Sequence, residues 1–191
     1  NQTTAIMDLD REGRMPLRYA YALDSYWFRV MPDMPEFRTD LSGKGSDWLW
    51  LNSLSISSGD GAYPLLATSI EARPEIKERE VLRDRVQFIR DFTGRGLRWA
   101  NTHIAGDRTL DVALDMIEQG SADAGLSEEE IRAKRHGSDH CRVNPRPDQI
   151  PRLKKLGVIM SCAPKYITGD GPDVAADYGE EYLSWVVPMR S

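Results

Sequence analysis

The sequence has few cysteines, no long apolar run and no cluster of basic charge, and each of these absences excludes a class of protein. Its 191 residues include 25 Lys and Arg against 30 Asp and Glu, for a formal net charge of -5. Because the two signs are interleaved, we expect no nucleic-acid partner. No window approaches the roughly 18 to 20 apolar residues of a membrane-spanning helix, so we expect no membrane partner.

Cysteine and N-terminal signals are scarce as well. The only two cysteines, Cys141 and Cys162, exclude a framework of several disulfides but not a single bridge, and they make a reducing, cytoplasmic compartment the default expectation. Residues 1–10 lack the basic and apolar pattern of a signal peptide. The first residue is Asn rather than Met, which indicates a chain trimmed or taken from a longer protein.

What the sequence does contain is an alternation of short extended segments and amphipathic helices. The predicted strands are Leu17–Trp27, Trp48–Ser57, Leu97–His103, His136–Val143 and Val158–Cys162. The predicted helices are Glu75–Phe92, a segment around Leu110–Ile117 stopped by Gly120, Glu128–Arg135 and Pro147–Leu156. This order favours parallel strands joined by crossover helices, hence an α/β fold. No repeat or linker divides the chain, so we interpret residues 1–191 as one unit.

The number of strands bears on the architecture. A complete (β/α)8 TIM barrel usually needs about 250 residues, so five β/α units fit either an incomplete barrel of that type or a complete open sheet. No glycine-rich phosphate fingerprint follows a predicted strand, which argues against a dinucleotide-binding sheet. Ser127 and Glu130 have the spacing of a capping box and predict where one helix begins.

Histidines near strand ends are the first candidates for chemistry. His103 and His140 lie at the predicted carboxyl ends of neighbouring strands, where parallel α/β folds gather their sites. Imidazoles at the same height on neighbouring strands can share a metal ion. The alternative is that each is a hydrogen-bonded core or loop residue. His136 lies four residues before His140, but Gly137 and Ser138 disfavour a helix there, so His136 is interpreted as structural or surface.

Several neighbouring residues are interpreted structurally. Asp107 is placed to cap the next helix. Asp139 should face away from His140, because adjacent residues in a strand alternate between faces. Cys141 and Cys162 are expected to be packed thiols.

Two further residues are candidates for substrate binding. Asp60 lies in the turn Gly59-Asp60-Gly61, where a site role and a turn role are equally favoured. Arg108 suits a substrate carboxylate, although an arginine on a first helical turn more often faces solvent.

Two motifs resemble those of metal-dependent amidohydrolases. Residues 99–108 read WANTHIAGDR and, with Asp111 to Ile117, resemble the fifth-strand motif, where a His ends the strand and Gly-Asp opens the next helix. Residues 138–141 read SDHC and are followed by PDQIPRLKKL and GVIMSCAP, which resemble the sixth-strand His, its helix and the seventh strand. The similarity is to amidohydrolase family 3, the group with N-substituted formamide deformylases. It runs from about residue 13 to 191, is loose before Ile70, and corresponds roughly to strands three to seven of the barrel.

The resemblance implies both an activity and a site. The activity is hydrolysis of a carbon–nitrogen bond in an amide, formamide or cyclic amide, acting on a small-molecule substrate. The cofactor is a divalent metal, Zn by ligand preference, held in part by His103 and His140. The family's His-x-His pair on strand one and catalytic Asp on strand eight have no counterpart here, so no general base is assigned. No Lys precedes Asp60 in its strand, which favours one metal over a bridged pair.

Two functions from different classes remain open. The first is the metal-dependent hydrolase, to which this chain supplies part of the barrel. The second is a non-catalytic α/β binding or interaction domain that lacks a complete metal site. An incomplete barrel exposes unpaired strand edges, which favour self-association into a homo-oligomer.

Overall fold

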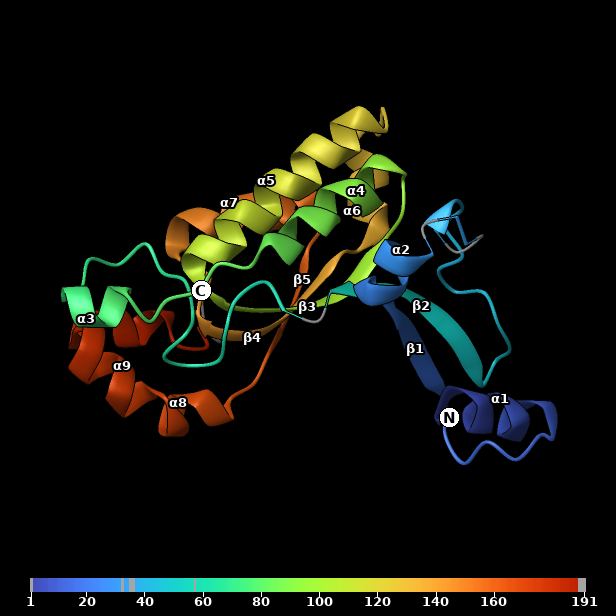
Figure 1. Ribbon diagram of the computed structural model, residues 1–191, viewed down its shortest axis with the longest axis horizontal. Coiled ribbons are helices and arrows are strands. Elements are labelled where there is room, and N and C mark those ends of the chain that lie inside the picture. The colour runs from blue at the N-terminus through green and yellow to red at the C-terminus, as the bar shows by residue number, and fades with distance from the viewer. Residues whose placement is uncertain (1, 32, 35–36, 57, 189–191) are drawn as a thin grey trace.

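The computed structural model describes residues 2–31, 33–34, 37–56 and 58–188, and its centre is a five-stranded sheet (Figure 1). The strands are β1 (Tyr19–Asp24), β2 (Leu49–Ile56), β3 (Trp99–Gly106), β4 (Gly137–Val143) and β5 (Ile159–Cys162). They lie in chain order, β1-β2-β3-β4-β5, and every neighbouring pair is parallel. The predicted α/β fold is confirmed. The described strands form an open sheet, so the TIM barrel stays a prediction.

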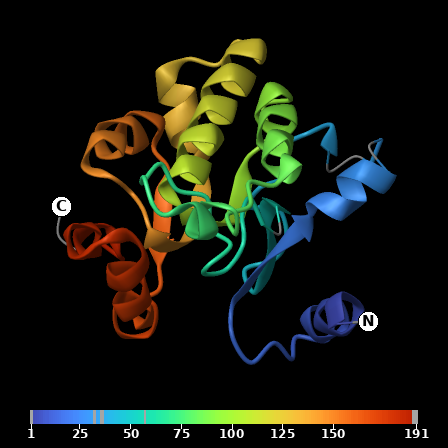
Figure 2. The same ribbon diagram turned by 60° about the vertical axis from the view of Figure 1, so that its left-hand side comes forward.

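Helices cover the sheet mainly on one face. They are α1 (Gln2–Arg11), α2 (Ser25–Val30), α3 (Pro74–Lys77), α4 (Phe88–Gly94), α5 (Asp107–Asp123), α6 (Glu128–Lys134), α7 (Ile150–Leu156), α8 (Lys165–Gly169) and α9 (Gly171–Tyr178). In Figure 1, α4, α5, α6 and α7 lie together above the sheet, while α3, α8 and α9 gather where β3 and β4 end. Figure 2 shows α1 set apart on the β1 side. Within the described ranges, no helix has the length and apolar character needed to cross a membrane.

Two apolar clusters hold these layers together. The larger fills the space between the sheet and α4, α5 and α7, and includes the fully buried Ile56, Trp99 and Leu114. Each such side chain contributes about 1.5 to 3 kcal/mol by leaving water. The smaller cluster includes Val143 and Tyr166 and lies at the carboxyl ends of the strands. It therefore packs beside the edge of the sheet where a site is expected.

The predicted helix Glu75–Phe92 is wrong as a continuous element. The structure has the four-residue α3, a 3-10 turn at Asp84–Gln87 and then α4. The intervening backbone pairs with another segment instead, because the N–H of Val81 donates to Leu65 O and the N–H of Arg83 donates to Gly59 O. A long-range contact therefore replaces the local helical hydrogen bonds.

Other boundaries follow local chemistry. Strand β1 ends earlier than predicted because the Asp24 carboxylate accepts a hydrogen bond from the N–H of Tyr26 (2.7 Å) and so caps α2. The capping box of Ser127 and Glu130 is confirmed at the start of α6. The predicted strand Trp48–Ser57 matches β2, although residue 57 lies outside the described residues.

Gly120 does not stop its helix, because α5 continues to Asp123. A Cβ atom on Gly120 would lie 1.9 Å from Oγ1 of Thr93 and 2.6 Å from the Arg90 carbonyl oxygen. The glycine is therefore needed for the close packing of α5 on α4, and the helix end was assigned to it wrongly.

Candidate metal centre

The two histidines selected from the sequence lie side by side. His103 on β3 and His140 on β4 have ring centroids 3.9 Å apart, with 52° between the ring planes. Their side chains are 15% and 30% exposed, so both remain accessible. The strands run parallel and end soon afterwards, at Gly106 and Val143, so the pair lies toward the carboxyl edge of the sheet. That edge is where parallel α/β folds place ligands.

An irregular backbone in β4 turns His140 toward His103. In the pairing of β3 with β4, His103 lies beside Asp139 and His140 lies beside Ile104, which is buried in the core. Regular alternation would therefore put the two imidazoles on opposite faces. However, His140 has φ of 81° and Cys141 has φ of 48°, a left-handed conformation that residues other than glycine adopt rarely. This irregularity places the two rings together.

Asp60 is the hydrogen-bond partner of the His103 ring. Its Oδ1 lies 3.2 Å from Nδ1 of His103, and its carboxylate also accepts hydrogen bonds from the N–H groups of Ala105 (3.0 Å) and Gly106 (2.8 Å). A carboxylate oxygen accepts the hydrogen bond, so Nδ1 of His103 donates to Asp60. Asp60 is fully buried. Its position thus fits a role in orienting His103 rather than the substrate contact considered from the sequence.

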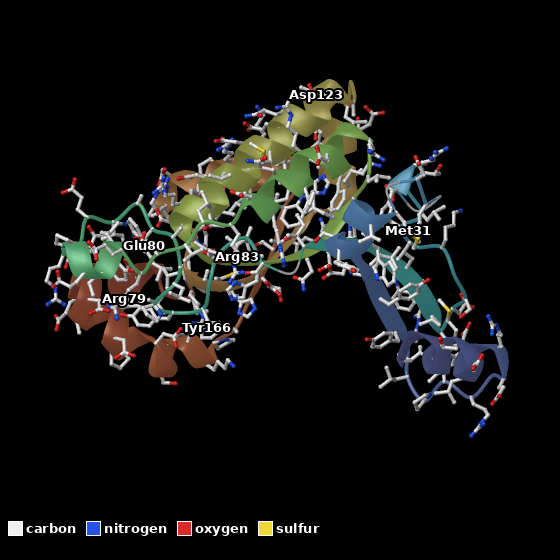
Figure 3. The ribbon with its side chains drawn as sticks, viewed as in Figure 1. Met31, Arg79, Glu80, Arg83, Asp123 and Tyr166 are labelled. Carbon is white, nitrogen blue, oxygen red and sulfur yellow. A yellow bond between two sulfur atoms is a disulfide. The ribbon has the colours of Figure 1, made fainter. Side chains whose placement is uncertain are left out.

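Tyr166 makes the equivalent contact with His140. Its hydroxyl lies 2.5 Å from Nδ1 of His140, and the two rings are stacked at 5.8 Å with 25° between their planes. Tyr166, labelled in Figure 3, lies on α8 and is buried. The Arg142 guanidinium lies over the Tyr166 ring, 4.1 Å from its centroid. The Nδ1 atoms of both histidines are thus occupied by neighbouring side chains.

Asp139 lies nearer to the pair than the sequence predicted. Alternation was expected to turn it away from His140, but its Oδ1 is 3.7 Å from Nε2 of His140. That oxygen is buried and accepts no hydrogen bond from any described residue. The prediction was wrong because the left-handed backbone at His140 breaks the alternation on which it relied. A carboxylate oxygen therefore borders the His140 imidazole.

Burial and neighbouring charges shift the basicity of His140. Loss of hydration is the largest cause and lowers the pKa of His140, while the nearby Asp139 carboxylate opposes that shift. His103 and Arg142 lower the pKa of His140 further. A lowered pKa keeps the imidazole neutral near pH 7, which is the form that binds metals.

The two cysteines form a disulfide, contrary to the expectation of packed thiols. Sγ of Cys141 on β4 is bonded to Sγ of Cys162 at the end of β5, and their Cα atoms are 4.9 Å apart. The left-handed backbone at Cys141 again explains the difference, because it redirects a side chain that alternation would have placed on the opposite face. Disulfides persist mainly in oxidising compartments. The bridge therefore does not support the reducing, cytoplasmic compartment expected from the sequence.

Asp107 and Arg108 lie at the start of α5, away from the paired rings. Asp107 is buried, but it does not cap the helix as predicted. It accepts a hydrogen bond from the N–H of Ser69 (3.0 Å) and forms an ion pair with Arg146. Arg108 is exposed and lines a surface depression together with Lys77 and other residues of that region. The described lining of this depression contains neither histidine.

His136 is a structural residue, as predicted. It is 1% exposed and stacks on Trp99, with ring centroids 5.8 Å apart. Its Nδ1 accepts a hydrogen bond from the N–H of Trp99 at 3.2 Å. Burial, helped by the nearby charge of Arg98, lowers the pKa of His136 to about 3. This histidine therefore stays neutral and lies outside the candidate centre.

The paired imidazoles suit a metal ion but do not complete its coordination. Histidine ligands usually hold one ring nitrogen by a carboxylate or a similar partner while the other binds the metal, which is the arrangement of His103 with Asp60 and of His140 with Tyr166. Among the described residues, however, no group of three or more His, Cys, Asp or Glu is arranged to hold a metal. Catalytic zinc sites normally have three protein ligands. His103 and His140 are thus two candidate ligands, one fewer than such a site normally has.

Two features of the centre were missed in the sequence. Tyr166 follows the last predicted strand and carries no motif, so only the fold shows its contact with His140. The disulfide depends on the register between β4 and β5, which pairs His140 with Cys162. The position of Cys141 directly after His140 was the one sequence signal for the disulfide. Strand alternation, however, predicted that Cys141 would face away from His140.

The fold and the centre together define a class, a parallel α/β protein with paired histidines toward the carboxyl edge of its sheet. No protein-family profile and no curated protein matches the sequence. Among solved structures, the chain is similar to one described as an uncharacterized metal-dependent hydrolase from Pyrococcus horikoshii OT3, with a TM-score of 0.71 and 24% identity. The similarity covers 96% of this chain and 35% of that one, so our chain spans about a third of that protein. The likeness shows a shared fold, and the resemblance to amidohydrolase family 3 stays a prediction.

Proposed function

We propose that this chain is part of a metal-dependent hydrolase and that His103 and His140 are two of its metal ligands. The observation that carries the proposal is the pair of adjacent imidazoles, each with Nδ1 in contact with a buried partner. The similarity in fold to a protein described as a metal-dependent hydrolase supports it.

The residues of the centre have separate tasks in this proposal. Asp60 accepts from Nδ1 of His103 and fixes the direction of its ring, and the Tyr166 hydroxyl fixes the ring of His140 through its contact with Nδ1. A divalent metal bound at the Nε2 atoms would polarise a substrate carbonyl and lower the pKa of a bound water. Asp139 borders this position with an oxygen that accepts no hydrogen bond from the described residues. The general base that takes a proton from water is not assigned to a residue here.

The finer parts of the proposal rest on the sequence motifs. Hydrolysis of a carbon–nitrogen bond in an amide, formamide or cyclic amide follows from the resemblance of the two histidine motifs to amidohydrolase family 3. Zn is the proposed metal, because neutral imidazoles suit it. The strand order β1 to β5, with α4 to α7 on one face, supports a barrel of the TIM type, whose strands are also ordered by sequence. Open strand edges support self-association.

Metal binding by the full-length protein tests the proposal. The metal-free protein is titrated with Co²⁺, and the visible absorption of the bound ion gives the stoichiometry and the dissociation constant. We expect about one ion per chain, and at least a tenfold weaker affinity in His103→Ala and in His140→Ala. His136→Gln is the control, because His136 is a buried histidine outside the centre.

The outcomes separate the two classes of function. Unchanged affinity in both alanine variants would contradict the ligand assignment. A protein that binds no metal would favour the non-catalytic binding domain instead. If metal binds as expected, a panel of formamides, amides and cyclic amides, with matched esters for comparison, tests whether the hydrolysed bond joins carbon to nitrogen.

A further inference from the structure

The disulfide joins the two sides of the candidate metal centre. Cys141 directly follows His140, and Cys162 precedes Tyr166 by four residues. Because the Tyr166 hydroxyl contacts Nδ1 of His140, a closed loop runs from His140 through the disulfide and the chain to Tyr166 and back. The bridge thus links the histidine to the residue that orients it.

The backbone at this point depends on its surroundings. His140 and Cys141 both have positive φ, a conformation that is unfavourable for a residue with a side chain. Besides the pairing of β4 with β3 and β5, two backbone hydrogen bonds hold this segment, from Ala163 N–H to His140 O (3.4 Å) and from Val187 N–H to Cys141 O (3.1 Å). The first is long. The bond to Cys162 adds a covalent constraint to the segment that carries the His140 ring beside His103.

We propose that the Cys141–Cys162 disulfide is a redox-sensitive link that positions His140, so that its reduction weakens metal binding. This inference rests on the proposed function, since it concerns the regulation of the same centre. In the oxidised state the bridge fixes the segment of His140 against that of Tyr166. In the reduced state the segment relaxes, and the contact of Tyr166 with Nδ1 of His140 is lost.

The chemistry of the switch is a thiol–disulfide exchange with a dithiol. Cys162 is partly exposed, whereas Cys141 is fully buried. A thiolate of the dithiol therefore attacks Sγ of Cys162. The S–S bond breaks, Cys141 leaves as a thiolate and takes up a proton, and a mixed disulfide forms on Cys162. The second thiol of the reductant then releases Cys162. The protein gains two electrons and two protons, and the dithiol becomes a cyclic disulfide.

The test compares metal affinity in the two redox states of the full-length protein. One half of the sample is reduced with dithiothreitol, which is then removed by anaerobic gel filtration because it binds metals itself. Each half is titrated with Co²⁺. We expect the dissociation constant to rise about tenfold on reduction, as for other losses of an orienting partner, and to recover after reoxidation. The double variant Cys141→Ala, Cys162→Ala should bind as weakly as the reduced protein, with or without dithiothreitol.

A second measurement does not depend on the metal. Long-range ¹H–¹⁵N spectra of the metal-free protein report the hydrogen bonding of each imidazole nitrogen. We expect the Nδ1 signal of His140 to shift on reduction, while the signals of His136, which is held by the backbone of Trp99, stay in place. His136 is thus an internal control for general unfolding.

Each outcome has a distinct meaning. Equal Co²⁺ affinity in the two redox states, or an unchanged His140 signal on reduction, would overturn this inference and leave the proposed function standing. Absence of Co²⁺ binding in both states would overturn the proposed function and this inference together. A shift of His140 and His136 alike would show that reduction unfolds the protein, and would overturn the local switch.

Discussion

Replacement of Asp60 separates its structural task from its task in the metal centre. In Asp60→Ala, the buried N–H groups of Ala105 and Gly106 lose their acceptor, and Nδ1 of His103 loses its partner. Each unsatisfied buried N–H costs about 1 to 3 kcal/mol. Two of them lower the free energy of unfolding by roughly 2 to 6 kcal/mol. Asp60→Asn keeps the size and one acceptor oxygen, so we expect a loss of about 1 to 3 kcal/mol.

Two assays on the same variants measure the structural effect and the effect on metal binding separately. Urea unfolding measures the loss of stability, and Co²⁺ titration measures the metal affinity of the folded protein. The freed His103 ring should weaken metal binding by about 10- to 100-fold in Asp60→Asn. Asp107→Asn is the matched control, since Asp107 is also fully buried and bonded to other groups, Ser69 and Arg146. It should lose stability and keep its metal affinity.

Two results would refute this reasoning. If Asp60→Asn bound Co²⁺ as tightly as the wild type, Asp60 would have no orienting role for His103. If Asp107→Asn weakened metal binding as strongly as Asp60→Asn, the effect would follow from lost stability at any buried carboxylate rather than from the contact with His103.

Two further predictions concern stability alone. Burial lowers the pKa of His136 to about 3, so between about pH 6.5 and pH 3 this side chain is protonated in the unfolded chain and neutral in the folded one. The free energy of unfolding therefore falls as the pH drops through this range. His136→Gln should make this slope shallower by up to about 1.4 kcal/mol per pH unit in urea titrations at several pH values, and equal slopes would contradict it. Ser127→Ala removes the cap of α6 and should lower the free energy of unfolding by about 1 kcal/mol, with Ser184→Ala as an exposed control that stays unchanged.

Local chemistry explains why much of the fold could be predicted. Strands β1, β2 and β5 lie where apolar and aromatic residues cluster, and α6 begins where Ser127 and Glu130 form the capping box. These features depend on residues within a few positions of one another. The proximity of His103 and His140 was also predictable in outline, because parallel strands bring their carboxyl ends to one edge.

Predictions failed where distant segments supply the decisive contact. The helix expected over Glu75–Phe92 is interrupted because Val81 and Arg83 bond to a loop more than 15 residues earlier in the chain. Gly120 looked like a helix stop, but it is a packing residue between α4 and α5. Neither partner is visible in a window along the sequence.

The sequence by itself determined the α/β alternation, the five strands and the two histidines that carry the candidate chemistry, because hydrophobic periodicity and capping act locally. Only the tertiary structure decided how those histidines are used. The left-handed backbone at His140 and Cys141 exists because neighbouring strands and the disulfide hold it. That single irregularity breaks the alternation of β4, brings His140 beside His103 and leaves Asp139 at the same centre.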